Sequence, residues 1–128
     1  MSSQKEARQR ELSAEELNDL IVDSMQDIKA KNIVKIDLRH IDDAPTDFFI
    51  ICEGDSSTQV KAISDNIYRR LKSEGDNLPF HYEGQQNSLW ILLDYFNTVV
   101  HVFYNETRAF YELEELWGDC IFTEYHDL

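Results

Sequence analysis

Two polar side chains, Asp94 and His101, stand in an otherwise apolar part of the chain. The aspartate lies in the run Leu89–Tyr95 and the histidine in the run Thr98–Tyr104, and both runs have strand length. An aspartate close to a histidine could form a general-base pair, but such catalysis also needs a nucleophile within reach, and the sequence identifies none beside them. The competing interpretation is that both are satisfied polar groups beneath a covering helix, and spacing alone favours it.

The short segment between the two runs predicts how their side chains are arranged. If Phe96-Asn97 is a two-residue turn, the runs form a β-hairpin in which Asp94 faces Val99 and Leu92 faces His101. Because strand side chains alternate, six of them share what we call the hairpin face: Trp90, Leu92, Asp94, Val99, His101 and Phe103. The other face is almost wholly apolar and is the better core surface. A face that is apolar in area, with a few polar groups, is typical of a protein-binding hot spot.

Three helices are predicted along the chain. Ser13 and Glu16 form a capping-box pattern that precedes an apolar stripe of helical spacing. A second stripe of the same kind follows Gly54–Ser57. A third helix is predicted to begin at Asn105 and to stop at Gly118, carrying aromatic and leucine side chains between them.

Further strands are predicted at 34–38, 48–52 and 80–83, where short apolar or alternating runs are bounded by turn residues. Together with the hairpin they predict a single-domain α/β sandwich with a mixed sheet of about five strands and about three helices. The expected divisions are a flexible N-terminal tail at 1–12, the domain at 13–120 and a C-terminal tail at 121–128.

Charge and composition argue against several classes of function. The chain has 128 residues and a formal net charge of −13 at pH 7, which disfavours sequence-specific nucleic-acid binding and anionic membrane surfaces. Acidity suits a basic protein partner, although it could equally serve only to keep the protein soluble. No apolar run approaches the roughly 20 residues of a membrane span, and the two cysteines make no disulfide framework. We therefore expect a cytoplasmic protein.

Metal and cofactor sites are not predicted. His40, His81 and His126 are scattered, and none stands at metal-ligand spacing with a cysteine or a second histidine. The helix start at Gly54–Ser57 presents backbone N–H groups to which an anion could bind, but helix capping explains this pattern more often.

Three ordered motifs resemble the ribosomal silencing factor (RsfS, or Iojap) family. They are Thr46–Ile51 followed by Gly54–Val60, Trp90–Tyr95 followed by Val99–Phe103, and Thr107–Trp117. Together they cover the chain from about Leu17 to Cys120. The chain departs from the family pattern at Asp55, where a small hydroxyl residue or alanine is common, and at Phe96-Asn97, where Gly-Asp is frequent.

The resemblance implies a nucleotidyltransferase-like α/β fold without that activity. It also implies binding to large-subunit ribosomal protein fourteen, which blocks association of the two ribosomal subunits and represses translation in starved or stationary cells. On this hypothesis Trp90 and Leu92 anchor the partner, Asp94 pairs with a basic group, and Tyr95 and His101 flank them. Tyr95 falls on the opposite face in the predicted register.

Two other hypotheses remain open from the sequence. One is a nucleotide-binding or nucleotidyltransferase-type enzyme of the same fold that uses Gly54–Ser57 and Asp94. Against it, no close pair of carboxylates follows that helix start before Asp65, whereas two-metal chemistry needs clustered oxygen ligands. The other is a homodimer formed through the hairpin face.

Overall fold

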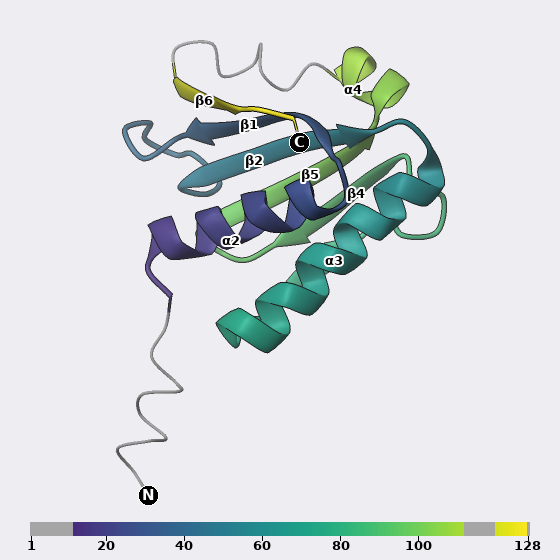
Figure 1. Ribbon diagram of the computed structural model, residues 1–128. Helices are drawn as coiled ribbons and strands as arrows, with labels where there is room; N and C mark the ends of the chain where they lie inside the picture. Colours follow the sequence, from purple (N-terminus) through teal and green to yellow (C-terminus); the bar gives the residue numbers. More distant parts are fainter. Residues whose placement is uncertain (1–11, 112–119, 128) are drawn as a thin grey trace, which may run out of the picture.

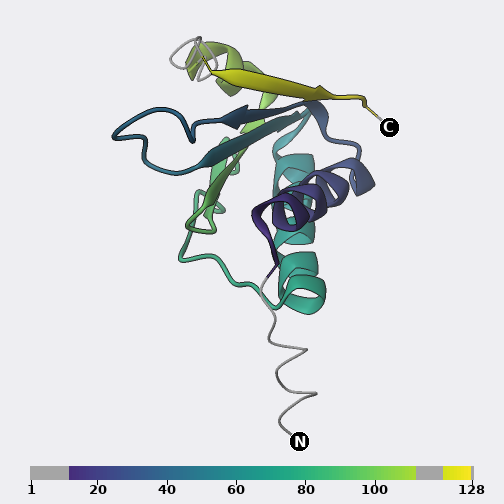
Figure 2. The ribbon, with the colours of Figure 1, turned by 90° about the vertical axis from the view of Figure 1, so that its left-hand side faces the viewer.

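The computed structural model describes residues 12–111 and 120–127 and shows one mixed sheet with helices packed against it (Figure 1). The described elements, in chain order, are α2 (Ala14–Asp27), β1 (Lys31–Asp37), β2 (Phe48–Gly54), α3 (Ser57–Gly75), β3 (His81–Glu83), β4 (Trp90–Asp94), β5 (Thr98–Tyr104), α4 (Asn105–Tyr111) and β6 (Ile121–Tyr125). Figure 2 shows that α2 and α3 both lie on the same side of the sheet. The predicted mixed α/β fold with three helices is confirmed for these residues.

The sheet has six strands among the described residues, in the order β3-β4-β5-β2-β1-β6. β2 and β5 run parallel, and the other neighbouring strands run antiparallel. The prediction of about five strands was one short, because 121–125 had been assigned to a C-terminal tail. This segment instead pairs along β1, from Ile33 opposite Tyr125 to Asp37 opposite Ile121.

The two long helices begin where their caps predict. The Ser13 hydroxyl accepts a hydrogen bond from the Glu16 backbone N–H, and the Glu16 carboxylate accepts one from the Ser13 N–H, which completes the capping box of α2. At α3, the Ser56 hydroxyl accepts from the Gln59 N–H. This helix ends at Gly75, and the left-handed residue that closes it is Asp76, with φ 51°.

Apolar side chains pack on both faces of the sheet. The larger cluster joins the helices to the inner face of the hairpin, and its fully buried members include Ile21, Met25, Ile63, Ile67, Ile91, Leu93, Val100 and Val102. The smaller cluster lies on the opposite face and includes Ile36, Phe49, Ile51 and Phe103. The hairpin face belongs to this second surface, on the side away from α2 and α3 (Figure 2).

The third helix is described only in part. α4 begins at Asn105, as predicted, and is described as far as Tyr111. The expected continuation through Leu113, Leu116 and Trp117 to Gly118 lies outside the described residues, as does most of the N-terminal segment predicted to be a tail.

Candidate functional site

The β4–β5 hairpin has the predicted register. Asp94 pairs with Val99, Leu92 with His101 and Trp90 with Phe103. The six side chains of the hairpin face differ in exposure. Trp90, Leu92, Asp94 and Val99 are half-buried, whereas His101 and Phe103 are buried. The face therefore combines an accessible part with a packed base, the buried pair His101 and Phe103.

Trp90 is held in place by its neighbours on β5. Its indole N–H donates a hydrogen bond to Nδ1 of His101, with 3.0 Å between the nitrogens. Its ring also stacks on Phe103, with centroids 5.0 Å apart. A side chain whose orientation is already fixed loses little conformational entropy when another surface covers it.

His101 is a neutral, buried residue beneath Trp90. It does not form the general-base pair with Asp94 that the sequence left open. Because Nδ1 accepts from Trp90, the ring proton sits on Nε2, which is buried and has no hydrogen-bond partner. The Phe49 ring packs edge-to-face on the imidazole at 4.9 Å. This burial lowers the pKa of His101 to about 4. In this tautomer Nδ1 is engaged by Trp90 and Nε2 carries the proton, so neither ring nitrogen has a free lone pair.

Asp94 closes the hairpin turn. Its Oδ1 accepts a hydrogen bond of 2.8 Å from the backbone N–H of Phe96, and its backbone carbonyl accepts one of 2.7 Å from the N–H of Phe80. The carboxylate is thus at the exposed end of the face and fixed by the turn. Its second oxygen, Oδ2, could accept from a basic group on a partner.

Two aromatic side chains beside Asp94 were not selected from the sequence. Phe80 and Phe96 are each 71% exposed, and their ring centroids lie 5.9 Å apart. The sequence places Phe80 at the start of the predicted strand 80–83, whereas in the structure both residues lie outside the strands. The one available signal was a phenylalanine in a two-residue turn, a place where glycine or asparagine is usual.

Tyr95 is not part of the hairpin face. Its side chain is 5% exposed and belongs to the cluster beneath the helices, and this burial raises its pKa. Among the predicted site residues, the structure therefore groups Trp90, Leu92, Asp94 and His101 and places Tyr95 on the other side of the sheet. Its direct contact with a partner stays a prediction that this position does not favour.

The helix start at Gly54–Ser57 is occupied by the chain itself. The Gln59 side chain accepts a hydrogen bond of 2.7 Å from the Asp55 N–H, and its amide donates to the carbonyls of Ile28 and Lys29. These contacts cap the helix and tie it to the end of α2, which is a structural role. Within residues 12–111 and 120–127, no group of three or more His, Cys, Asp or Glu side chains is arranged to hold a metal ion.

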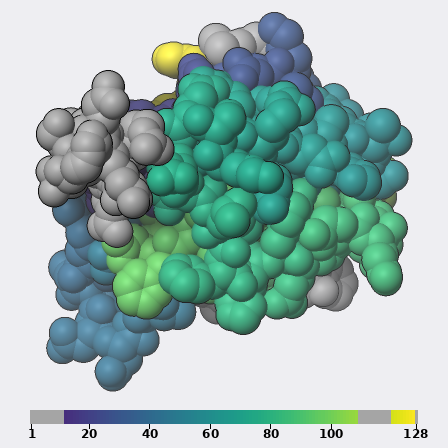
Figure 3. Space-filling model, turned by 90° about the horizontal axis from the view of Figure 1, so that it is seen from below, coloured from purple at the N-terminus to yellow at the C-terminus, as the bar shows by residue number. Residues whose placement is uncertain are grey.

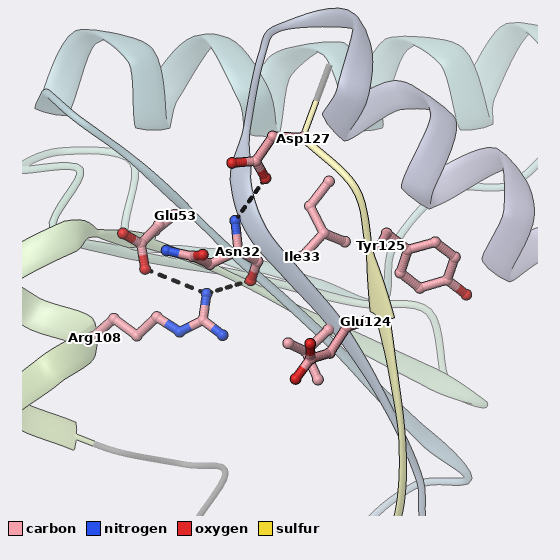
Figure 4. A pocket seen from close by; sticks show the side chains of 8 residues that line it. Asn32, Ile33, Glu53, Arg108, Glu124, Tyr125 and Asp127 are labelled. Carbon is pink, nitrogen blue, oxygen red and sulfur yellow. Dashed lines mark hydrogen bonds and ion pairs between the residues drawn. The ribbon is translucent and has the colours of Figure 1, made fainter.

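A pocket of about 350 Å³ lies between β1, β6 and α4 (Figure 4). Arg108 reaches across it, and Nη1 donates to the Asn32 carbonyl at 2.5 Å and lies 3.4 Å from a Glu53 carboxylate oxygen. Glu124 and Asp127 also line the pocket, so its charge does not suit an anion. The contacts anchor α4 to the sheet, which gives Arg108 of the third sequence motif a structural role.

No helix in the described part of the chain is both long and apolar enough to cross a membrane. Comparison with known proteins gives a consistent family assignment. The family model "Ribosomal silencing factor during starvation" matches residues 11–128. The ribosomal silencing factor RsfS of Halalkalibacterium halodurans is 38% identical over 109 residues, which cover 85% of this chain and 92% of that protein.

More distant and structural relatives agree with this assignment. The mouse protein named mitochondrial assembly of ribosomal large subunit protein 1 is 36% identical over 76 residues, covering 56% of this chain and 32% of that protein. A crystal structure from Chromobacterium violaceum superposes with a TM-score of 0.79 at 32% identity, covering 84% of this chain and 88% of that one. The extent of the family match and the identity to its members establish that this chain belongs to the ribosomal silencing factor (RsfS) family.

Proposed function

We propose that this protein binds the large ribosomal subunit through ribosomal protein fourteen and prevents the small subunit from joining. Translation would be repressed in this way under starvation or in stationary phase. The observation that carries the proposal is the hairpin face, where a half-buried, pre-oriented Trp90 and the half-buried Asp94 stand at opposite ends of β4. Binding hot spots are enriched in tryptophan, and complementary charges around them contribute to specificity.

The roles follow from the exposure of each side chain. Trp90 and Leu92 supply the apolar anchors, and Asp94 pairs with a basic group of the partner. His101 supports Trp90 from below through the 3.0 Å hydrogen bond. Tyr95 supports the hairpin from the core side, a position that does not favour the direct contact predicted for it.

The charge of the chain favours a protein partner over RNA. A net charge of −13 attracts a basic protein and repels phosphate backbones, so it weakens non-specific contact with neighbouring rRNA. The name of the mouse relative refers to the large ribosomal subunit, which supports that subunit as the partner.

Sedimentation with separated ribosomal subunits tests the proposal. Wild-type protein should co-migrate with the large subunit alone, and Trp90→Ala should weaken this binding by roughly 2 kcal/mol or more. Ile121→Ser is the matched control, because Ile121 is 64% exposed on the far edge strand. Circular dichroism should confirm that every variant is folded. Binding to neither subunit would refute the proposal.

Blocked joining of the subunits requires a separate measurement. Large subunits saturated with wild-type protein should form fewer complete ribosomes on addition of small subunits, and Trp90→Ala should restore them. Sedimentation equilibrium of the protein alone would detect a homodimer. Dimerisation through the hairpin face would hide Trp90, so Trp90→Ala would then also dissociate the dimer.

A further inference from the structure

Phe96 occupies a backbone conformation that phenylalanine rarely adopts. Its φ is 75°, in the left-handed region where a Cβ atom crowds the backbone and glycine is normally preferred. The ring is 71% exposed, so the strain is not offset by hydrophobic burial of the ring. Strained residues that display an exposed group are concentrated at functional sites.

Hydrogen bonds hold the backbone of Phe96 on both sides, and Phe80 contacts its ring. The Phe96 N–H donates to Asp94 Oδ1 at 2.8 Å, and the Phe96 carbonyl accepts from the hydroxyl of Thr46 at 2.8 Å. Thr46 is buried and lies in the loop between β1 and β2, residues 38–47. Phe80 supports the ring from the third side, at 5.9 Å between centroids. Phe96 is therefore presented by three separate segments of the chain.

The loop that holds Phe96 is rich in carboxylates. Asp42, Asp43 and Asp47 are exposed in the β1–β2 loop that holds Phe96. Arg39 of the same loop is already bound to Asp37, with 2.7 Å between Nη2 and Oδ2. Figure 3 shows this loop, in blue, projecting beside the green of the hairpin. An apolar tip with an acidic rim is complementary to a basic protein surface that contains an apolar recess.

The tip lies just beyond the row of hairpin-face side chains on β4. Trp90, Leu92 and Asp94 alternate along β4, and Phe96 follows at its end. Six residues of extended chain span about 20 Å, and a standard interface of about 800 Å² per partner is about 30 Å across. One partner surface can therefore cover both Trp90 and Phe96.

We propose that Phe96, supported by Phe80, is a second aromatic anchor for the same basic protein partner, at the opposite end of the row from Trp90. The inference rests on the proposed function and adds to it the extent of the contact surface. Phe96 inserts into an apolar recess of the partner, and the carboxylates of Asp47 and Asp94 meet basic groups at its rim.

The test uses Phe96→Gly, because glycine accepts the φ of 75° and removes only the ring. Its affinity for purified large ribosomal subunits is measured beside wild type, Phe96→Tyr, Trp90→Ala and Ile121→Ser. Ile121 is a matched exposed apolar residue, and the register through Asp37 and Phe48 places it on the helix side of the sheet. Phe96→Gly should weaken binding about tenfold, whereas Phe96→Tyr and Ile121→Ser should bind like wild type.

Each outcome separates the inference from the proposed function. Unchanged affinity of Phe96→Gly together with weakened binding of Trp90→Ala overturns the second anchor and leaves the proposed function standing. Equal losses for Phe96→Gly and Ile121→Ser also overturn it, because they would indicate non-specific apolar adhesion. If wild-type protein binds no subunit, both the proposed function and the inference are wrong.

Discussion

Trp90 and His101 form a single unit across the hairpin, in which the indole N–H donates to the imidazole Nδ1 at 3.0 Å. The bond fixes the orientation of the tryptophan and the tautomer of the histidine together. Because the histidine is buried beneath the tryptophan, the half-buried ring rests on a base that does not change charge near neutral pH.

Acid should destabilise the protein through His101. Its pKa is lowered to about 4 in the folded state and is about 6.5 when unfolded, so between these values the unfolded chain binds more protons. Stability therefore falls as pH drops from about 6.5 to about 4, by roughly 3 kcal/mol in total. Urea unfolding at a series of pH values would measure this.

His101→Leu should remove that part of the pH dependence, because leucine takes up no proton in the unfolded chain. Subtracting one curve from the other removes the contribution of the carboxylates to the free energy of unfolding, because they titrate in both proteins. His40→Leu, at an exposed histidine, is the matched substitution to be measured beside it. If the curves of His101→Leu and wild type are parallel, folding does not lower the pKa of His101.

Substitutions of Asp94 should separate its structural role from its charge. Asp94→Asn keeps an oxygen that accepts from the Phe96 N–H, so its stability should match wild type. Asp94→Ala loses that acceptor and should be destabilised by about 1 kcal/mol. If the carboxylate pairs with a basic group of the partner, both variants should weaken binding and reduce its dependence on salt. Chemical denaturation and affinities at two salt concentrations provide these values, and tight, salt-sensitive binding by Asp94→Asn would contradict the pairing.

Because Phe96 has a positive φ, a glycine at this position should give a more stable protein than an alanine, the reverse of the usual order. Phe96→Gly should be more stable than Phe96→Ala by about 1 kcal/mol, because only glycine relieves the crowding at φ 75°. At Phe80, whose φ is not in this region, the alanine variant should be at least as stable as the glycine variant. Thermal unfolding of the four variants compares them, and the same order at both positions would contradict the left-handed turn.

Removal of Arg108 should destabilise the fold strongly. Arg108→Met leaves the Glu53 carboxylate, whose side chain is 14% exposed, without this cation, and the expected cost is about 3 kcal/mol. The double variant Arg108→Met with Glu53→Gln should recover part of the loss, because the unpaired charge is gone. Denaturant midpoints for the two single variants and the double variant test the coupling. Strictly additive losses would show that the pair is not coupled.

The hairpin register could be predicted from the sequence because a two-residue turn and strict alternation leave one pairing that buries the apolar set. The same reasoning located α2 and α3, whose caps and apolar stripes are local signals. β6 could not be predicted, since its five residues contain no buried side chain and its pairing depends on the free edge of β1. A strand of that kind is specified by its neighbour more than by its own composition.

The sequence by itself determined which side chains share the hairpin face, because alternation along a strand is a property of the local backbone. Only the tertiary structure decided which side chains of that face are buried and which are accessible. α2 and α3 packed on the other side, Phe49 came from a distant strand to bury His101, and Thr46 and Phe80 came to support Phe96. Burial and charge state depend on contacts between segments far apart in the chain. Local sequence patterns do not predict those contacts.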